Sequence, residues 1–321
     1  MIQYRYVKKT VNHAQLGQRL DQALAKLFPN YSRSQIKAWI IDGLVKVNGL
    51  VKTVPKKILF GGELIEIKIL IKDKSCYVAQ DIHLNIVYED DDIIVLNKPP
   101  GLVVHPGAGN ADGTLLNALL HYYPPILEVP RAGIVHRLDK DTTGLMVVAK
   151  TVQAQICLVK SLQAREITRE YEAVSVGTMI SGGTVEQPIA RHATKRTHMS
   201  VHPMGKPAIT HYRIIAHYRA HTLLRLRLET GRLHQIRVHM AHIHHPLVGD
   251  PLYCGRFRPQ KGASEKLNTV LRCFNRQALH AIFLRFYHPI TSIEMEWQAP
   301  LPEDMVILLE ALQIENKKFK N

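Results

Sequence analysis

Residues 134–144 read Ile-Val-His-Arg-Leu-Asp-Lys-Asp-Thr-Thr-Gly and hold the densest group of charged and turn-forming side chains in the chain. The pattern predicts two strands, 134–139 and 145–149, joined by a turn. Alternate side chains of a strand share a face, so Arg137 and Asp139 would point the same way. A carboxylate held among cations stays ionised and can act as a nucleophile or base. A surface ion pair that leads into an Asx turn is the alternative interpretation.

Outward from this segment, residues 229–240 read Glu-Thr-Gly-Arg-Leu-His-Gln-Ile-Arg-Val-His-Met. A strand is expected to end at Gly231, and the spacing of the apolar residues that follow predicts a helix. The start of a helix attracts anions, and Arg232 and Arg237 would strengthen that attraction. An ordinary strand-to-helix junction with solvated arginines explains the same pattern.

The run 191–198 is strongly basic because it contains Arg191, Lys195 and Arg196. Glycines before and after the run predict a mobile loop. Such a loop is suited to grip the phosphates of a nucleic acid, although a solvated loop is equally consistent with the pattern.

Four histidines, His239, His242, His244 and His245, suggest a metal site at first sight. Their spacing is not His-Glu-x-x-His, and the nearest acidic residue is Asp250, so RNA contact or helix packing is the preferred interpretation. The chain also lacks the glycine patterns of dinucleotide and phosphate-binding loops. We therefore expect neither a metal ion nor a small-molecule cofactor.

The charge balance favours an anionic partner. The 321 residues include 42 Lys or Arg against 27 Asp or Glu, a formal net charge of +15. Residues 1–75 alone hold 14 Lys or Arg and 5 Asp or Glu. This excess fits nucleic acid or an acidic membrane surface, and its position fits a basic docking domain attached to a working one.

The sequence also indicates the compartment of the protein. Its four cysteines lie far apart and suggest no disulfide framework. The first residues do not resemble a signal peptide, and no apolar stretch approaches the 18 or so residues needed to cross a bilayer. We expect a soluble, reduced, cytoplasmic protein without membrane partners, and a monomer in the absence of a sustained heptad.

Two domains are expected, with a boundary near residue 76. Residues 19–28 and 32–42 have helical spacing, with Ser32 as the N-cap of the second helix, and Asn48-Gly49 is a strong turn signal between short strands. These elements make residues 1–75 a compact basic module, followed by a linker over 72–81.

Residues 76–321 form the second predicted domain. No regular alternation of strand and helix runs through it, so we expect an α+β fold with a mixed, largely antiparallel sheet flanked by helices. In the helix predicted over 152–165, Val152, Ile156, Val159 and Leu162 would share one face. The other elements expected are strands at 93–97, 102–105, 168–176 and 222–228, and a helix at 114–123.

Taken together, these segments resemble one family. Arg137-Leu-Asp139 followed by Asp141-Thr-Thr-Gly-Leu is similar to the catalytic motif of the large-subunit type of pseudouridine synthases. Residues 93–101, 169–173 and 230–250 resemble its other sequence blocks, in the expected order. Residues 19–49 resemble the small alpha-L RNA-binding domain that often precedes this catalytic domain.

The resemblance implies that the protein converts uridine to pseudouridine in 23S rRNA or a precursor of the large ribosomal subunit, with the helix 69 stem-loop as target. The base is detached at its nitrogen, rotated and rejoined through ring carbon five, without cofactor or metal. By the resemblance, Asp139 is the nucleophile, attacking the ring or the sugar carbon, and Arg237 pairs with it. Tyr171 lies against the target ring, as a possible base, and Arg137 fills the gap left by the flipped nucleotide.

RNA contacts are expected in both domains. The residues assigned to them, beside Arg137, are Arg19, Arg33, Lys37, Arg191, Lys195, Arg196 and Arg232. Two other functions stay open on sequence alone. One is a pseudouridine synthase that acts on tRNA or another rRNA loop, and the other is a catalytically silent RNA-binding assembly factor.

Overall fold

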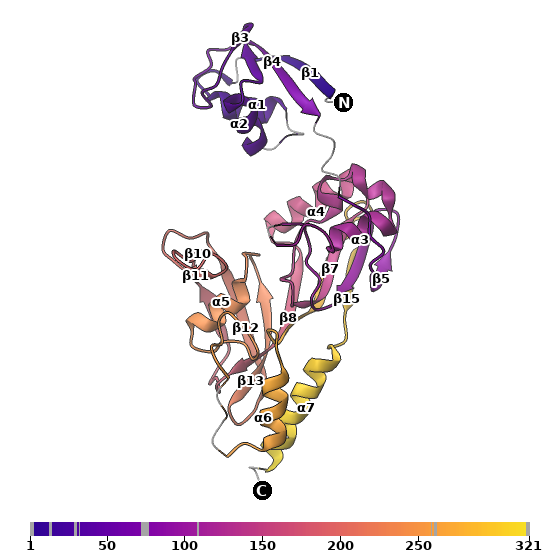
Figure 1. The fold of residues 1–321 in the computed structure, drawn as a ribbon, viewed down its shortest axis with the longest axis vertical. Helices are drawn as coiled ribbons and strands as arrows, with labels where there is room; N and C mark the ends of the chain where they lie inside the picture. Colours follow the sequence, from indigo (N-terminus) through magenta and orange to yellow (C-terminus); the bar gives the residue numbers. More distant parts are fainter. Residues whose placement is uncertain are drawn as a thin grey trace. The chain divides into compact units, whose positions relative to one another are not determined.

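The computed structural model of the chain describes residues 3–12, 15–28, 31, 33–71, 77–107, 109–257, 259 and 262–318. The chain divides into two compact units, Met1–Cys76 and Tyr77–Asn321, which are described separately (Figure 1). The N-cap predicted at Ser32 and the first part of the predicted linker lie outside the described residues.

The N-terminal unit packs two helices against a four-stranded antiparallel sheet of order β1-β4-β2-β3. Asn48 and Gly49 form the tight turn between β2 and β3, with φ of 50° and 77°, as a two-residue hairpin requires. The two helices pack through fully buried Leu24 and Ile40. The sequence signals missed β1. The elements are β1 (Gln3–Thr10), α1 (Leu20–Leu27), α2 (Arg33–Ile41), β2 (Val45–Val47), β3 (Leu50–Val51) and β4 (Leu64–Ile71).

The C-terminal unit is built on a nine-stranded sheet of order β5-β6-β7-β14-β8-β13-β12-β9, with β15 paired to β14. Each adjacent pair is antiparallel except β7 with β14, which is parallel. The predicted α+β class with a mixed, largely antiparallel sheet is therefore confirmed. Its strands are β5 (Ile86–Glu89), β6 (Ile93–Lys98), β7 (Thr143–Ala149), β8 (Thr168–Val176), β9 (Gly183–Glu186), β12 (Ile209–His217), β13 (His221–Leu228), β14 (Leu279–Tyr287) and β15 (Glu294–Gln298).

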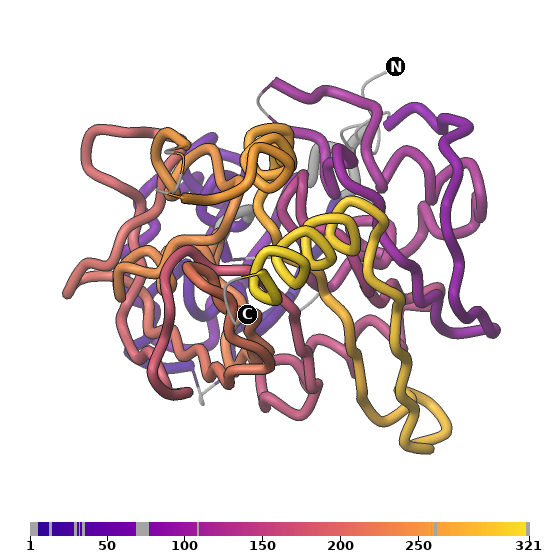
Figure 2. The backbone as a smooth tube through the Cα atoms, turned by 90° about the horizontal axis from the view of Figure 1, so that it is seen from below, coloured from indigo at the N-terminus to yellow at the C-terminus, as the bar shows by residue number. Residues whose placement is uncertain are grey.

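Helices cover this sheet, and a separate hairpin, β10 (Ile189–Arg191) with β11 (Met199–Val201), stands beside it. The last two helices lie side by side and pack through Leu271 and Leu308 (Figures 1 and 2). Among the described residues, no helix is long and apolar enough to span a membrane. The helices are α3 (Leu115–Tyr122), η2 (Pro124–Glu128), η3 (Pro130–Gly133), α4 (Val152–Ala164), α5 (Gln235–His242), α6 (Glu265–Cys273) and α7 (Glu303–Lys318).

Two predicted strands are wrong. In 102–105 only Val103 makes an isolated bridge, and the carbonyl of Leu102 accepts a hydrogen bond from Lys98 instead of a strand partner. In 134–139 only Ile134 makes a bridge, and the amide of Val147 on β7 donates to the ring of His136. Side chains therefore occupy backbone groups that a further strand would need.

The apolar face predicted on α4 is only partly the face that the helix buries. Val152 and Ile156 are 45% and 50% exposed, whereas Ala154 and Leu158 are buried. Leu162, a member of the predicted face, is partly buried with them, so the helix packs through residues four apart that share only Leu162 with that face.

Candidate active site

A cleft of about 590 Å³ in the C-terminal unit brings together residues from distant parts of the sequence. Asp139, Tyr171 and Arg237 all line it, as do Arg137 and Arg232. The structure therefore places all three predicted catalytic residues in one concave site, together with two of the predicted RNA-binding arginines.

Buried Lys98 anchors the segment that carries Asp139. Its Nζ donates to the carbonyls of Pro99, Leu102 and Lys140 at 2.7, 3.0 and 2.8 Å. Burial lowers the pKa of Lys98 to about 7, against the opposing effect of nearby carboxylates. The side chain thus ties the end of β6 to the residue next to Asp139.

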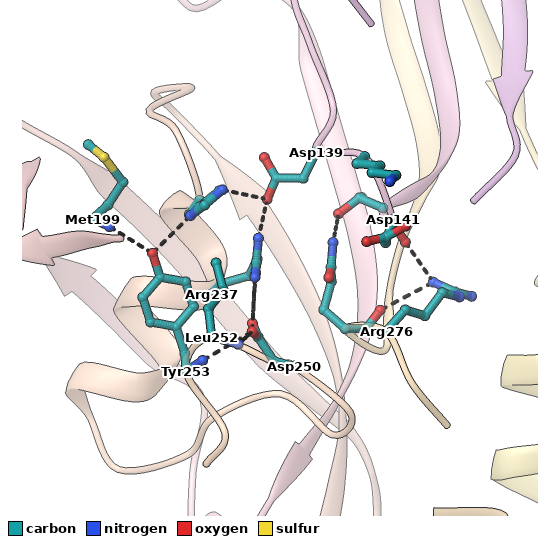
Figure 3. Close-up of polar contacts among 12 residues, drawn as sticks. Asp139, Asp141, Met199, Arg237, Asp250, Leu252, Tyr253 and Arg276 are labelled. Carbon is teal, nitrogen blue, oxygen red and sulfur yellow. Dashed lines mark hydrogen bonds and ion pairs between the residues drawn. The ribbon is translucent and has the colours of Figure 1, made fainter. Parts of the chain in front are cut away.

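Two residues just before β14 hold the other side of the same turn. Arg276 Nη1 donates to the carbonyl of Asp141 at 3.2 Å (Figure 3), and Gln277 Nε2 donates to Thr142 Oγ1 at 2.9 Å. Within the turn, the amide of Thr142 donates to the carbonyl of Asp139 at 3.1 Å. Asp139 therefore lies at the start of a turn that two other segments hold in place, the end of β6 and the residues before β14.

Gly144 is required where β7 meets β14. Its φ is +114°, and a Cβ there would lie 2.3 Å from the carbonyl oxygen of Ala281. Only glycine permits this approach of two backbones, which lets β14 pair directly behind the Asp139 turn.

Arg237 lies between two carboxylates (Figure 3). Its Nε and Nη2 donate to Asp250 at 2.7 and 2.9 Å, and its Nη1 donates to Asp139 Oδ2 at 2.9 Å. Asp250 is fully buried and also accepts from the amides of Leu252 and Tyr253. Burial alone would lower the pKa of Arg237, but the two carboxylates raise it overall, so this side chain stays cationic.

A second chain of contacts reaches Asp139 through Tyr253 and His234. The Tyr253 hydroxyl accepts from the amide of Met199 on β11 and contacts His234 Nδ1, each at 2.8 Å (Figure 3). His234 Nε2 lies 3.9 Å from Asp139 Oδ2. Burial lowers the pKa of His234, so its ring is neutral at pH 7. The tyrosine hydroxyl can donate its own proton to Nδ1, which leaves the Nε2 proton facing the carboxylate.

Tyr171 is 5% exposed and lies on β8 in the cleft wall. Burial raises the pKa of its hydroxyl, so the side chain is a neutral phenol at pH 7. The Asp139 side chain keeps 16% of its surface exposed. The site therefore offers an accessible carboxylate, a fixed guanidinium behind it and an aromatic ring in the wall.

The predicted basic loop is a defined hairpin formed by β10 and β11. Arg191 ends β10, and its Nη1 donates to the carbonyl of Arg196 at 2.8 Å. Lys195 and Arg196 are exposed at the tip. None of the three lines the cleft, but the Met199–Tyr253 hydrogen bond connects their hairpin to it.

The predicted RNA-binding residues of the N-terminal unit are only partly free. Arg19 and Arg33 both bind the buried carboxylate of Asp21, at distances from 2.8 to 3.1 Å. Burial alone would raise the pKa of Asp21, but the two arginines outweigh this effect and lower the pKa overall. Lys37 is exposed on α2. The three residues lie on one unit, with the charge of Asp21 offsetting part of theirs.

The histidine cluster does not form a metal site. His239 contacts Thr210 Oγ1 and the carbonyl of Gln187, each at 2.9 Å, and His245 contacts the carbonyl of Val176. No group of three or more His, Cys, Asp or Glu that could hold a metal ion occurs in the part of the chain that the structure describes. These contacts favour helix packing for His239.

Sequence reasoning missed Lys98, His234, Tyr253 and Arg276 as parts of the site, and noted Asp250 only as the nearest acid to the histidines. Lys98 and Asp250 lie in the segments 93–101 and 230–250, and the resemblance of these segments to the family was the signal that could have identified them. Arg276 and Tyr253 carried none, because the contacts that bring them to the site join distant residues, Arg276 with Asp141 and Tyr253 with Met199.

Comparisons with known proteins agree on one activity. Residues 92–242 match the family model described as RNA pseudouridylate synthase, and residues 18–65 match the S4 domain. The chain is 67% identical to "Ribosomal large subunit pseudouridine synthase D" of Yersinia pestis, covering 100% of this chain and 99% of the relative. The namesake protein of Escherichia coli strain K12 is also 67% identical, with 100% and 98% covered.

Solved structures give the same picture at lower similarity. Human RNA Pseudouridylate Synthase Domain Containing 4 superposes with a TM-score of 0.56 and 27% identity, covering 71% of this chain and 93% of that one. Human RNA Pseudouridylate Synthase Domain Containing 1 gives a TM-score of 0.53 at 27% identity, with 70% and 86% covered.

Proposed function

The chain belongs to the RNA pseudouridylate synthase family and carries an S4 domain, and from this we propose that it isomerises uridines of 23S rRNA in the large ribosomal subunit or its precursor. The names of the relatives support the substrate. The observation that carries the chemistry is Asp139, accessible in a cleft and held by Arg237.

We propose that Asp139 is the nucleophile. It bonds to the ring or to the sugar carbon, and the bond between ring nitrogen one and the sugar breaks. The base rotates, ring carbon five bonds to the sugar in place of nitrogen one, and the bond to Asp139 is broken again. Carbon five then loses its proton and nitrogen one gains one, so all atoms are conserved and no cofactor is required. Arg237 donates to the carboxylate from behind and holds it in the cleft, and covalent catalysis needs a nucleophile positioned in this way.

Tyr171 would pack against the target ring. Because burial raises the pKa of its hydroxyl, Tyr171 is protonated at pH 7, and this favours an aromatic contact over a role as general base. Arg137 is exposed at the mouth of the cleft, where its planar cation is suited to fill the space left by an extruded uridine. Extruding a base costs a few kcal/mol, and contacts between basic side chains and the RNA must offset this cost.

RNA binding is proposed for both units, residues 1–75 as the alpha-L type domain and 76–321 as the catalytic domain. The exposed cations at the hairpin tip, with Arg232 at the cleft and Lys37 on α2, provide phosphate contacts. We propose the helix 69 stem-loop as the target, a monomer as the active form and the cytoplasm as its location. Sedimentation of the protein with and without the stem-loop tests the monomer.

The decisive experiment measures tritium release from 23S rRNA that carries uridine tritiated at ring carbon five. We expect release by the wild type and none by Asp139→Asn, which should fold and bind RNA normally. Asp112→Asn, an exposed carboxylate of the same unit, is the control and should retain activity.

The outcome separates the alternatives. No release by the wild type from free 23S rRNA or precursor subunits, despite tight binding, would indicate an assembly factor and refute the proposal. Release from tRNA alone would retain the chemistry and change the substrate. Turnover by Asp139→Asn would remove the nucleophile assignment.

A further inference from the structure

Arg169 is a buried cation in the wall of the cleft. It stands two residues before Tyr171 on β8, and alternate residues of a strand share a face, so both side chains lie on the cleft side. Glu170 and Glu172 face the other way, where both bind Arg225. Arg169 is 8% exposed.

Arg169 differs from the other buried arginines of this unit in having no anionic partner. Buried Arg237 has two carboxylates and buried Arg276 binds Asp304, and even the half-buried Arg225 binds two glutamates. Arg169 makes no ion pair or hydrogen bond with any residue that the structure describes, and its Nε is buried without an acceptor. A buried charge of this kind is costly unless something compensates it.

The two carboxylates that line the same cleft are paired with other cations, Asp139 with Arg237 and Glu229 with Arg165. His136 is neutral, because burial and the neighbouring Arg169 lower its pKa to about 3. Arg165 also lines the cleft, but it forms an ion pair with Glu229. A Cβ on Gly231 would lie 3.1 Å from Arg169 Nη1, so the missing side chain at Gly231 leaves the room that the guanidinium occupies.

We propose that Arg169 binds a backbone phosphate of the RNA at or beside the target nucleotide. This inference rests on the proposed function and adds to it an anion-binding residue deep in the site. A phosphate supplies the full negative charge that the buried guanidinium lacks, and its oxygens match the forked donors of arginine. A uracil carbonyl carries no net charge and compensates the cation less.

The proposal predicts opposite effects of one substitution on RNA binding and on stability. Arg169→Met keeps the length of the side chain and removes an uncompensated charge, so the melting temperature should stay the same or rise. Affinity for a 23S rRNA fragment should fall roughly tenfold or more, as expected for a lost charge-assisted contact. The slope of log K against log salt should shrink by about one.

Three further variants make the test specific. Arg169→Lys keeps the charge, so its salt slope should match the wild type while its affinity falls less. Gly231→Ala crowds the guanidinium without removing it and should also weaken binding. Arg227→Met, an exposed arginine on the neighbouring strand β13, is the control and should change stability little.

Filter binding to the RNA fragment and thermal unfolding are measured for each variant, independently of turnover. An unchanged affinity and salt slope in Arg169→Met would overturn the proposal, and so would a large fall in melting temperature with normal binding, which indicates a structural role. A wild type that binds RNA but releases no tritium would refute the proposed function and leave the Arg169 result interpretable.

Discussion

Asp250→Asn tests whether the carboxylate behind Arg237 holds the site together. The substitution keeps the shape of the side chain and replaces one carboxylate oxygen by an NH₂ group. Asp250 accepts four hydrogen bonds, two from Arg237 and two from the amides of Leu252 and Tyr253. An asparagine can accept from the two amides only if its NH₂ group faces the guanidinium, and this places one hydrogen-bond donor against another.

The expected cost follows from burial. The side chains of Asp250 and Arg237 are 0% and 4% exposed, and removing one partner of a buried pair costs about 3–5 kcal/mol. For a unit of this size that corresponds to a fall in melting temperature of roughly 6–20 °C. Because Nη1 of Arg237 is no longer fixed, turnover should also fall by roughly tenfold or more.

Asp304→Asn is the matched control. Asp304 makes the same two-point contact with Arg276, at 2.5 and 2.7 Å, but its side chain is 43% exposed. Because solvent reaches this carboxylate, although Arg276 itself is buried, Asp304→Asn should cost less stability than Asp250→Asn. Thermal and urea unfolding, followed by a signal from the C-terminal unit, should separate the two variants. Equal losses, or a loss below about 1 kcal/mol for Asp250→Asn, would refute the reasoning from burial.

Three further predictions follow from the same geometry. Tyr253→Phe keeps the ring beside Arg237 and removes the hydroxyl that contacts His234, so turnover should fall several-fold while the Michaelis constant changes little. Steady-state tritium release measures both constants, and an unchanged turnover would contradict the role of His234. The pKa of Lys98 is about 7 in the folded protein and near 10.5 in the unfolded chain, so between these pH values the unfolded chain binds more protons. The stability of the wild type relative to Lys98→Met should therefore rise from pH 7 to pH 10. Urea unfolding at both pH values checks the sign. Lys37→Ala should reduce the salt slope of RNA binding by about one without loss of stability, whereas Arg33→Ala should also destabilise the N-terminal unit because it uncovers Asp21.

Local signals in the sequence predicted the elements that local chemistry determines. Asn48-Gly49 predicted its hairpin, and Gly144, expected at the end of a turn, is the second residue of β7, where a side chain would strike Ala281. The α+β class followed from the absence of a regular strand–helix alternation. In these places the neighbouring residues carry the information.

Contacts between distant segments were invisible to the same reasoning. Residues 134–139 alternate like a strand, but the His136 ring takes an amide of β7 that a strand would use. Lys98 reads as an ordinary surface lysine until residues 99, 102 and 140 place three carbonyls around it. The pairing of Arg237 with Asp139 came from the family resemblance, since no local rule joins residues 98 positions apart.

The order of strands in the C-terminal sheet has a consequence for how the protein is made. β14 lies between β7 and β8 although it is synthesised more than a hundred residues after either, and Arg276 and Gln277 just before it fix the Asp139 turn. A growing chain therefore holds Asp139 and Tyr171 on two unjoined halves of a sheet until residues 276–287 emerge from the ribosome. We therefore expect a chain that ends before residue 276 to be inactive, because β14 is the strand that joins the two halves.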